Sequence, residues 1–377
     1  MVFLNENAPL RTDSTFRNRD NEDHHISVSP FEDLSINMVN NFPLDYMHLI
    51  CLGVMKKMIH LWINENHISR QQFLFKRSLG VYNSFLKALR ARKYIPIEFA
   101  RRTRRINEVD RWKATEFRLF LLYLGPVILD KYLHKDYFKH FCVLNTAIRI
   151  LCHPKNCLLN NTCANELLIY FVKTFKALYG ESNIVYNVHN LIHICQDVKM
   201  YGPLHTFSAF PFENFMKTIK TMLCKSEKPL SQLNNRIHEY TRYTINKKNS
   251  STDKPLFLKP DGKSLPLNCT HLYKRIKFKY FVLTVKSPNN CCYLKDGSVF
   301  CIKHIGFKDK ILVVLGNKYI DLRPIPIYPC NSQYMNIHMS SGQTLDLEII
   351  PIIEIDIKGF NISFNNTYYI IPLLHCN

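Results

Sequence analysis

The chain has 377 residues, 46% of them hydrophobic, which is enough for two or three domains with buried cores. Its 50 Lys and Arg residues outnumber its 30 Asp and Glu residues, and the net charge of +20 favours a polyanionic partner, most simply nucleic acid. No signal-peptide pattern opens the sequence and no apolar run is long enough to cross a bilayer, so we expect neither a secreted nor a membrane protein.

The first acid of interest lies where an extended segment gives way to a helix. Residues 1–34 are polar and aperiodic, and we expect them to form a flexible arm. A short extended segment is predicted over 35–42, and Pro43 keeps the residue before it out of the helical region. Hydrophobic residues then recur at helical spacing from Met47. Asp45 is therefore expected at a helix N-terminus, with His48 about one turn later.

The middle of the chain is predicted to be helical. Hydrophobic periodicity predicts helices over 73–89, 112–124, 137–151, 164–179, 183–200, 212–224 and 230–243. A short aromatic segment over 206–210 precedes Glu213, which therefore has the same setting as Asp45: an apolar lead-in followed by a helix start.

The composition changes after about residue 245. Residues 246–270 have the content of a linker. Alternating runs rich in Val, Ile, Tyr and Phe then predict strands over 278–285, 299–305, 311–314, 319–322, 345–355 and 368–374. We predict a small antiparallel β barrel or sandwich over 271–377.

A basic tract runs from Lys76 to Arg118, with 13 Lys or Arg residues against four acids. Aromatic residues lie between the cations, as contacts to phosphates and bases would require. A solvated helix face or a nuclear import signal would also explain the tract. We interpret Glu116, which cations flank, as a member of an ordinary ion pair.

Histidines and cysteines give weaker signals. His189 and His193 share one helix face, but a zinc protease needs Glu where this chain has Asn190. We interpret them as a partly buried pair, with a supporting role near a phosphate or an acid as the alternative. The spacing of the cysteines at 152, 157 and 163 departs from that of a zinc site, and the 13 cysteines in no regular framework favour a reducing compartment.

Four motifs occur in order along the chain. They are Asp45-x-x-His48 followed by LGV at 52–54, WKATEFR at 112–118, YNVHNLIH at 186–193 and FPFENFM at 210–216. Together, over roughly residues 35–245, they resemble animal transposases of the CACTA (En/Spm-like) group, specifically the C-terminal part of such an enzyme.

The resemblance implies an α+β fold with a partial, truncated ribonuclease-H-like core over 35–64 and 206–245. An all-helical insertion over 65–205 would interrupt this core, and the small β domain would follow it. Asp45 would be the second acid and Glu213 the third acid of a DDE triad, and His48, which matches the histidine of the motif, would have a supporting role at the catalytic site. If the enzyme were active, these two acids would bind Mg²⁺ or Mn²⁺ and promote phosphoryl transfer. Acids are also common at inert helix N-termini.

The first acid of the triad is expected on a central strand, within a continuous apolar run. Residues 1–34 offer Asp13, Asp20, Asp23 and Asp33, none of them in such a run. We therefore expect the chain to be catalytically incomplete by itself.

These observations predict a transposon-derived nuclear protein that binds duplex DNA and has no small-molecule substrate. It would contact DNA through Arg101, Arg102, Arg104, Arg105, Lys113, Lys217 and Lys220. A homo-oligomer is compatible with this role. Two alternatives stay open: an active Mg²⁺-dependent nuclease or transposase that an upstream exon or a second chain completes, and a helical scaffold that binds only proteins.

Overall fold

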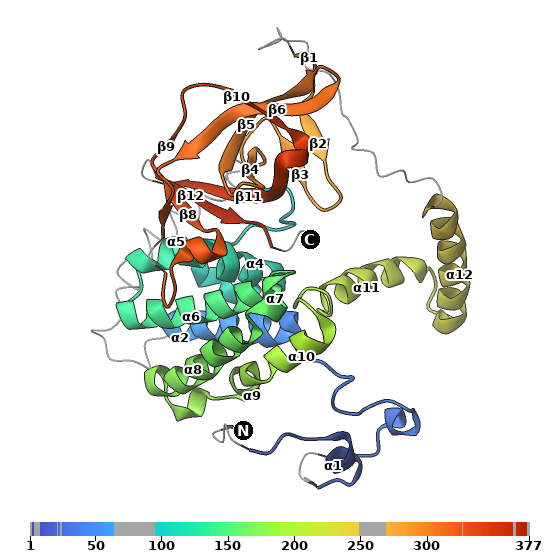
Figure 1. Cartoon of the computed structure of the whole chain (residues 1–377). Coiled ribbons are helices and arrows are strands. Elements are labelled where there is room, and N and C mark those ends of the chain that lie inside the picture. The colour runs from blue at the N-terminus through green and yellow to red at the C-terminus, as the bar shows by residue number, and fades with distance from the viewer. Residues whose placement is uncertain are drawn as a thin grey trace.

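The computed structural model describes residues 2–3, 8–20, 22, 25–63, 95–248, 269–325, 327–364 and 367–374. Figure 1 shows an all-helical region, a curled β region packed on one side of it, an N-terminal arm on the other side and a helical hairpin that projects outward. The fold is thus mixed helical and β, as expected. The helix predicted over 73–89 and most of the predicted linker lie outside the described residues.

The helical region is built around two long antiparallel helices. Its elements are a π-helical segment Met47–Met55, α2 Lys56–Ile63, α4 Ala114–Leu119, α5 Gly125–Ile128, α6 Lys135–Cys152, α7 Asn156–Leu159, α8 Asn161–Tyr179, α9 Tyr186–His189 and α10 Ile194–Tyr201. Helices α6 and α8 pack along each other, and Phe141, Leu144, Leu168 and Phe171 are completely buried. Within the described residues, none of the helices has both the length and the apolar character needed to cross a bilayer.

Buried polar side chains of α6 stabilise the irregular turn between α4 and α5. Residues Phe120–Leu124 form a π-helical turn, in which the ordinary pattern of backbone hydrogen bonds is interrupted. Asn145 Nδ2 donates to the Leu121 carbonyl oxygen at 2.7 Å, and Arg149 Nη1 donates to the Leu122 carbonyl oxygen at 2.9 Å. These bonds satisfy carbonyl groups that would otherwise be buried at a cost.

The helix predicted over 183–200 is interrupted. Residues Glu181–Asn183 form a 3-10 turn, and a second 3-10 turn at Asn190–Ile192 separates α9 from α10. The first break follows Gly180, which has a φ of 86°. That left-handed conformation suits glycine and ends α8.

The β region is one antiparallel sheet that curls into a half-barrel, with a small hairpin beside it (Figure 1). The strands follow the order β10-β6-β5-β4-β11-β12-β8-β7, while β1 pairs with β5 and β9 pairs with β6. Their bounds are β1 Thr270–Leu272, β2 Arg275–Lys277, β3 Val282–Thr284, β4 Cys291–Leu294, β5 Val299–Lys308, β6 Ile311–Ile320, β7 Arg323–Pro324, β8 His338–Ser340, β9 Gly342–Gln343, β10 Glu348–Pro351, β11 Ile355–Phe364 and β12 Thr367–Pro372. The predicted antiparallel β region is therefore present, in the form of a half-barrel.

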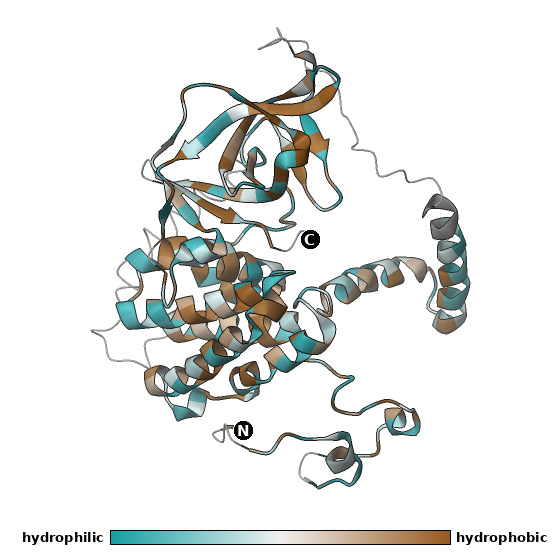
Figure 2. Ribbon diagram, viewed as in Figure 1, coloured by the Kyte–Doolittle hydropathy of each residue, from teal (hydrophilic) through white to brown (hydrophobic). Residues whose placement is uncertain are grey.

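The β region and the helical region share a continuous hydrophobic core. The Phe360 ring of β11 lies 5.6 Å from the Tyr123 ring and 5.5 Å from the Phe99 ring, measured between centroids. Arg149 Nη2 donates to the Pro372 carbonyl oxygen at 3.3 Å, and the Leu374 N–H donates to Tyr123 Oη at 3.1 Å. Figure 2 shows hydrophobic residues in both regions, as a shared core requires.

The segments expected to lead into the two acids are not strands. Residues 35–42 form turns and bends, and 206–209 form another turn before α11 begins at Phe210. Over the described residues, strands occur only from 270 onward. The prediction that extended segments precede Asp45 and Glu213 is therefore wrong, because the backbone forms local turns and bends at both positions.

Two outlying segments complete the fold. Helices α11 Phe210–Met222 and α12 Pro229–Lys248 form the projecting hairpin, and α11 has no buried residue. The N-terminal arm contains the short helix α1 Asp13–Arg17, which further contacts tie down. Arg17 donates to the carbonyl oxygens of Glu32 and Ile36, and Asp13 accepts a hydrogen bond of 2.6 Å from the Met38 N–H.

Candidate functional site

Asp45 caps the π-helical segment and also contacts a distant part of the chain. Its carboxylate accepts hydrogen bonds from the Met47 N–H at 3.2 Å and the His48 N–H at 2.8 Å, which is the pattern of a helix N-cap. The same carboxylate accepts a hydrogen bond of 2.7 Å from the Ala209 N–H. Asp45 therefore fixes the start of one helix and holds the residue that precedes another.

His48 lies between the two acids predicted from sequence. Its Nδ1 is 2.5 Å from Asp45 Oδ2, and its Nε2 is 3.4 Å from Glu213 Oε1. The Asp45 side chain is 22% exposed, whereas those of His48 and Glu213 are 58% and 59% exposed. The structure thus brings Asp45, His48 and Glu213 together at the surface, although they are far apart in sequence. A neutral imidazole can donate to one of these carboxylates, and a protonated one can donate to both.

Aromatic and cationic contacts hold the beginning of α11 in place. The Phe210 ring lies 6.1 Å from the Tyr46 ring, and the Arg118 guanidinium stacks 4.4 Å from the centre of the Phe210 ring. A cation over an aromatic face is stabilising, particularly when it is partly desolvated. Arg118 is the site residue that the sequence reasoning missed, although it ends the motif WKATEFR.

The fourth motif joins the same assembly through a glycine. A Cβ atom on Gly53 would lie 2.6 Å from Asn187 Nδ2 and 2.9 Å from the His48 carbonyl oxygen. A larger residue at this position would therefore displace the Asn187 side chain of α9. All four sequence motifs therefore contribute residues to one packed assembly beneath the Asp45–His48–Glu213 group.

The two acids do not form a ready-made metal site. Each acid faces the imidazole of His48, which lies between them. Among the residues that the structure describes, no group of three or more His, Cys, Asp or Glu side chains is arranged to hold a metal ion.

Residues 101–105, which we call the arginine loop, precede α4 and are held in place by Glu116. This carboxylate is buried, with 1% of the side chain exposed, and accepts hydrogen bonds from the Arg104 N–H at 3.1 Å and the Lys113 N–H at 2.9 Å. Arg104 Nη1 also lies 3.6 Å from Glu116 Oε2. The sequence predicted an ordinary ion-pair partner at this position. Glu116 is instead a buried carboxylate that also accepts two backbone hydrogen bonds and so fixes the conformation of the loop.

The other predicted DNA-contacting residues are accessible. Arg101, Arg102 and Arg105 are exposed, and a cavity of about 330 Å³ is lined by Arg101, Arg102, Arg104 and Glu116. Lys113 is exposed beside this loop, and Lys217 and Lys220 are exposed on α11. Of the seven predicted cations, Arg104 has its charge engaged by a buried acid, which ties its side chain to the loop itself.

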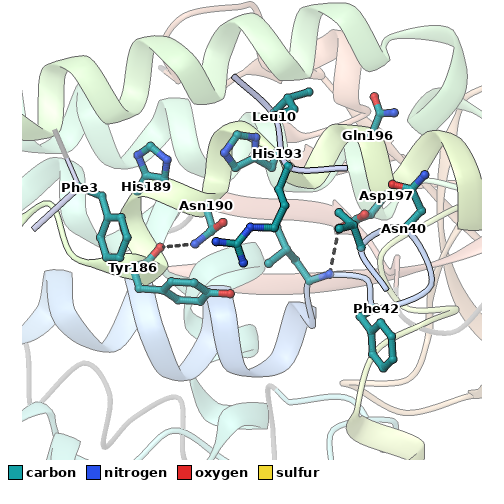
Figure 3. Close-up of a pocket in the computed structure, with 13 residues that line it drawn as sticks. Phe3, Leu10, Asn40, Phe42, Tyr186, His189, Asn190, His193, Gln196 and Asp197 are labelled. Carbon is teal, nitrogen blue, oxygen red and sulfur yellow. Dashed lines mark hydrogen bonds between the residues drawn. The ribbon is translucent and has the colours of Figure 1, made fainter. Parts of the chain in front are cut away.

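The histidine pair lies in a different pocket. The rings of His189 and His193 are 5.5 Å apart, and both line a cavity beside the N-terminal arm (Figure 3). Burial and the neighbouring His189 lower the pKa of His193 below its ordinary value. Both rings are partly buried, as the preferred interpretation held, but His189 Nδ1 has no hydrogen-bond partner among the described residues.

The cysteines at 152, 157 and 163 are free thiols. Cys152 and Cys157 are buried, while Cys163 is exposed. Burial raises the pKa of the Cys152 thiol to about 12, which disfavours the thiolate form that binds metals.

Comparison with known proteins gives a match for the β region. Residues 258–373 match a family model described as a domain of unknown function (DUF8592). No curated protein and no solved structure matches the chain.

Proposed function

We propose that this chain is a transposase-derived protein of CACTA (En/Spm-like) descent that binds duplex DNA and is catalytically incomplete by itself. The observation that carries the proposal is the meeting of Asp45, His48 and Glu213, with the other two motifs packed against the same segments through Arg118 and Asn187. Residues inherited from one ancestral active site are expected to lie close together in space. In this proposal, 35–64 and 206–245 are the remnant of a ribonuclease-H-like core, and 65–205 is its helical insertion.

The incompleteness rests on the acids available in the N-terminal arm. Asp13 is the only one of them with a well-anchored position in the described residues, and its carboxylate is engaged with the Met38 N–H and with Arg17 Nε at 3.0 Å. A carboxylate anchored in this way stabilises the arm. The alternative of an active nuclease would therefore need its first acid from another segment or another chain.

Duplex DNA is the proposed partner because of where the cations lie. The hairpin over 210–243 carries six Lys or Arg residues against three Glu residues, and it projects away from the body of the protein (Figure 1). The arginine loop adds a second cluster that surrounds a small polar cavity. Phosphate contacts of this type supply most of the affinity in non-specific DNA binding. A nuclear location follows from the proposed partner.

Salt dependence of duplex binding tests this proposal. The test variant replaces Arg101, Arg105, Lys217 and Lys220 with Gln, and the control variant replaces the exposed Lys277, Lys286, Lys295 and Lys303 of the β region with Gln. Both remove four charges. We expect the slope of log K against log salt to fall by up to about 3.6 in the test variant, since each phosphate contact contributes about 0.9. The control should retain most of the slope.

Three results would contradict the proposal or its surface. The absence of duplex binding at low salt would reject DNA as the partner, and an equal loss in the control variant would reject the assigned surface. Acidic peptides that compete as well as DNA would favour the scaffold alternative. That alternative has one observation behind it: the hairpin exposes large apolar side chains, including Phe212 and Leu230, which are 70% and 80% exposed.

A further inference from the structure

A pocket next to the segment that leads into Asp45 is lined by residues that have no part in the proposed binding of duplex DNA. It has a volume of about 560 Å³, within the range of small-ligand sites, and lies between the N-terminal arm and helices α9 and α10 (Figure 3). The arm is anchored here by the Phe3 N–H, which donates to the Ile184 carbonyl oxygen at 2.9 Å.

One wall of the pocket is aromatic. The Phe3 ring lies 6.0 Å from the Tyr186 ring and 5.6 Å from the His189 ring, with an angle of 31° between the planes of Phe3 and His189. Tyr186 is exposed, so one of its faces remains accessible to a ligand. Aromatic rings of this kind stack on planar heterocycles, with a typical gain of about 1–3 kcal/mol per nucleic-acid base.

The polar lining suits a heterocycle with an anionic group. Arg11 is exposed and contributes a guanidinium, the side chain that best matches phosphate geometry. Asn40 and Gln196 contribute amides, which can donate to and accept from the edge of a base, and Asn190, whose Nδ2 donates to the Tyr186 carbonyl oxygen at 2.9 Å, adds a third amide. Figure 3 shows these amide side chains on two sides of the pocket.

The single acid in the lining is already engaged. Asp197 Oδ2 accepts a hydrogen bond of 2.9 Å from the Leu44 N–H, and burial raises the pKa of this carboxyl. The Leu44 N–H dipole partly offsets the negative charge of Asp197, so this carboxylate repels a bound anion less strongly. The hydrogen bond also connects the pocket wall to the chain segment that continues directly into Asp45.

We propose that this pocket holds one unpaired nucleotide, with the base against the aromatic wall and the phosphate at Arg11. The nucleotide would come from a DNA strand that passes the Asp45–His48–Glu213 group, and this source rests on the proposed function. A free nucleoside monophosphate presents the same chemistry and is the alternative source. Since Leu44 borders the pocket and Asp45 follows it, occupancy of the pocket would place the neighbouring strand beside the acids.

Calorimetry and fluorescence with the full chain test the pocket. The probes are a deoxynucleoside monophosphate, the matching nucleoside, inorganic phosphate, a five-nucleotide single strand and a duplex. We expect the nucleotide to bind more tightly than the nucleoside or phosphate alone, because it uses both walls. Arg11→Gln and Tyr186→Leu should each raise its Kd about tenfold, whereas Lys303→Gln, which changes an exposed side chain of β5 outside the pocket, should leave it unchanged.

Both variants change exposed side chains, so circular dichroism is expected to show a retained fold. If no mononucleotide binds at millimolar concentration, or if neither variant changes its Kd, the pocket proposal is rejected. Weakened binding of the single strand in the same variants supports DNA as the source, while an unchanged single-strand Kd supports the free nucleotide and rejects the strand.

The two proposals fail separately. Loss of duplex binding with intact mononucleotide binding would overturn the proposed function and leave the pocket standing. Intact duplex binding with no mononucleotide binding would overturn the pocket alone.

Discussion

At the scale of single residues, the two acids have different environments and should have different roles. Asp45 accepts hydrogen bonds from three backbone N–H groups and is mostly shielded from solvent. Glu213 is largely exposed, and within the described residues the His48 ring is the one ionisable group that its carboxylate contacts. Asp45 is therefore a structural residue irrespective of any chemistry at the site, whereas the position of Glu213 contributes little to the fold.

This difference predicts unequal effects of two isosteric substitutions. Asp45→Asn replaces one of the accepting oxygens with a donor, and we expect it to reduce the free energy of unfolding by about 1–2 kcal/mol. Glu213→Gln should change it by less than about 0.5 kcal/mol, as expected for an exposed side chain. Urea denaturation of both variants measures the difference. Equal effects would contradict the structural role assigned to Asp45.

At the scale of elements, a buried ion pair joins the segment before the arginine loop to the β region. Lys358 of β11 is completely buried, and its Nζ lies 2.8 and 2.7 Å from the two carboxylate oxygens of Glu98. It also donates to the Val282 carbonyl oxygen and to Asn289 Oδ1, both at 2.7 Å. Four acceptors surround one ammonium group. Their contacts connect β11 to the hairpin β2–β3 and to the segment that contains Glu98.

Removing one partner of this pair should be costly. Glu98→Gln leaves the Lys358 ammonium buried without a counter-charge, and we expect a loss of about 3–5 kcal/mol in the free energy of unfolding. The double variant Glu98→Gln with Lys358→Met should recover much of this loss, because no buried charge remains. Chemical denaturation checks both values.

The matched control is an exposed ion pair with a similar distance. Lys176 Nζ lies 2.8 Å from Glu181 Oε1, but both side chains are well exposed. Glu181→Gln should therefore cost no more than about 1 kcal/mol. A comparable cost at both acids would show that burial does not govern the Glu98–Lys358 pair.

At the scale of the whole molecule, a shared core unites the helical and β regions and leaves the hairpin α11–α12 outside it. The core cluster runs from Tyr46 in the helical region to Leu374 at the end of the β region. The hairpin is attached through the start of α11, at Ala209 and Phe210. Regions without buried apolar contacts open at low free-energy cost, while those in a common core open together.

Hydrogen exchange should reveal this division. We expect amides of α11 and α12 to exchange at least about tenfold faster than those of α6 and α8, with the helical and β cores protected to a similar extent. Mass spectrometry of peptides after timed exchange measures the rates. Protection of the hairpin equal to that of α6 in the free protein would contradict its separation from the core.

Local patterns predicted most of the helices and several strands. The hydrophobic periods over 137–151 and 164–179 correspond to α6 and α8, and those over 299–305 and 368–374 fall largely within β5 and β12. Most of strand β11 was not predicted, although Ile355 and Ile357, and then Phe360, Ile362 and Phe364, alternate with other residues as in a strand. Lys358 is nevertheless buried, since Glu98, remote in sequence, supplies its counter-charge.

The sequence by itself determined the helical periodicity, the strongly basic charge and the residues of the four motifs, because each of these depends on residue type and spacing along the chain. Only the tertiary structure decided that His48 separates Asp45 from Glu213, that Arg118 stacks on Phe210 and that the segments leading to both acids are turns. Such contacts join positions far apart in sequence, and packing of the whole chain selects among the many pairings that local preferences permit.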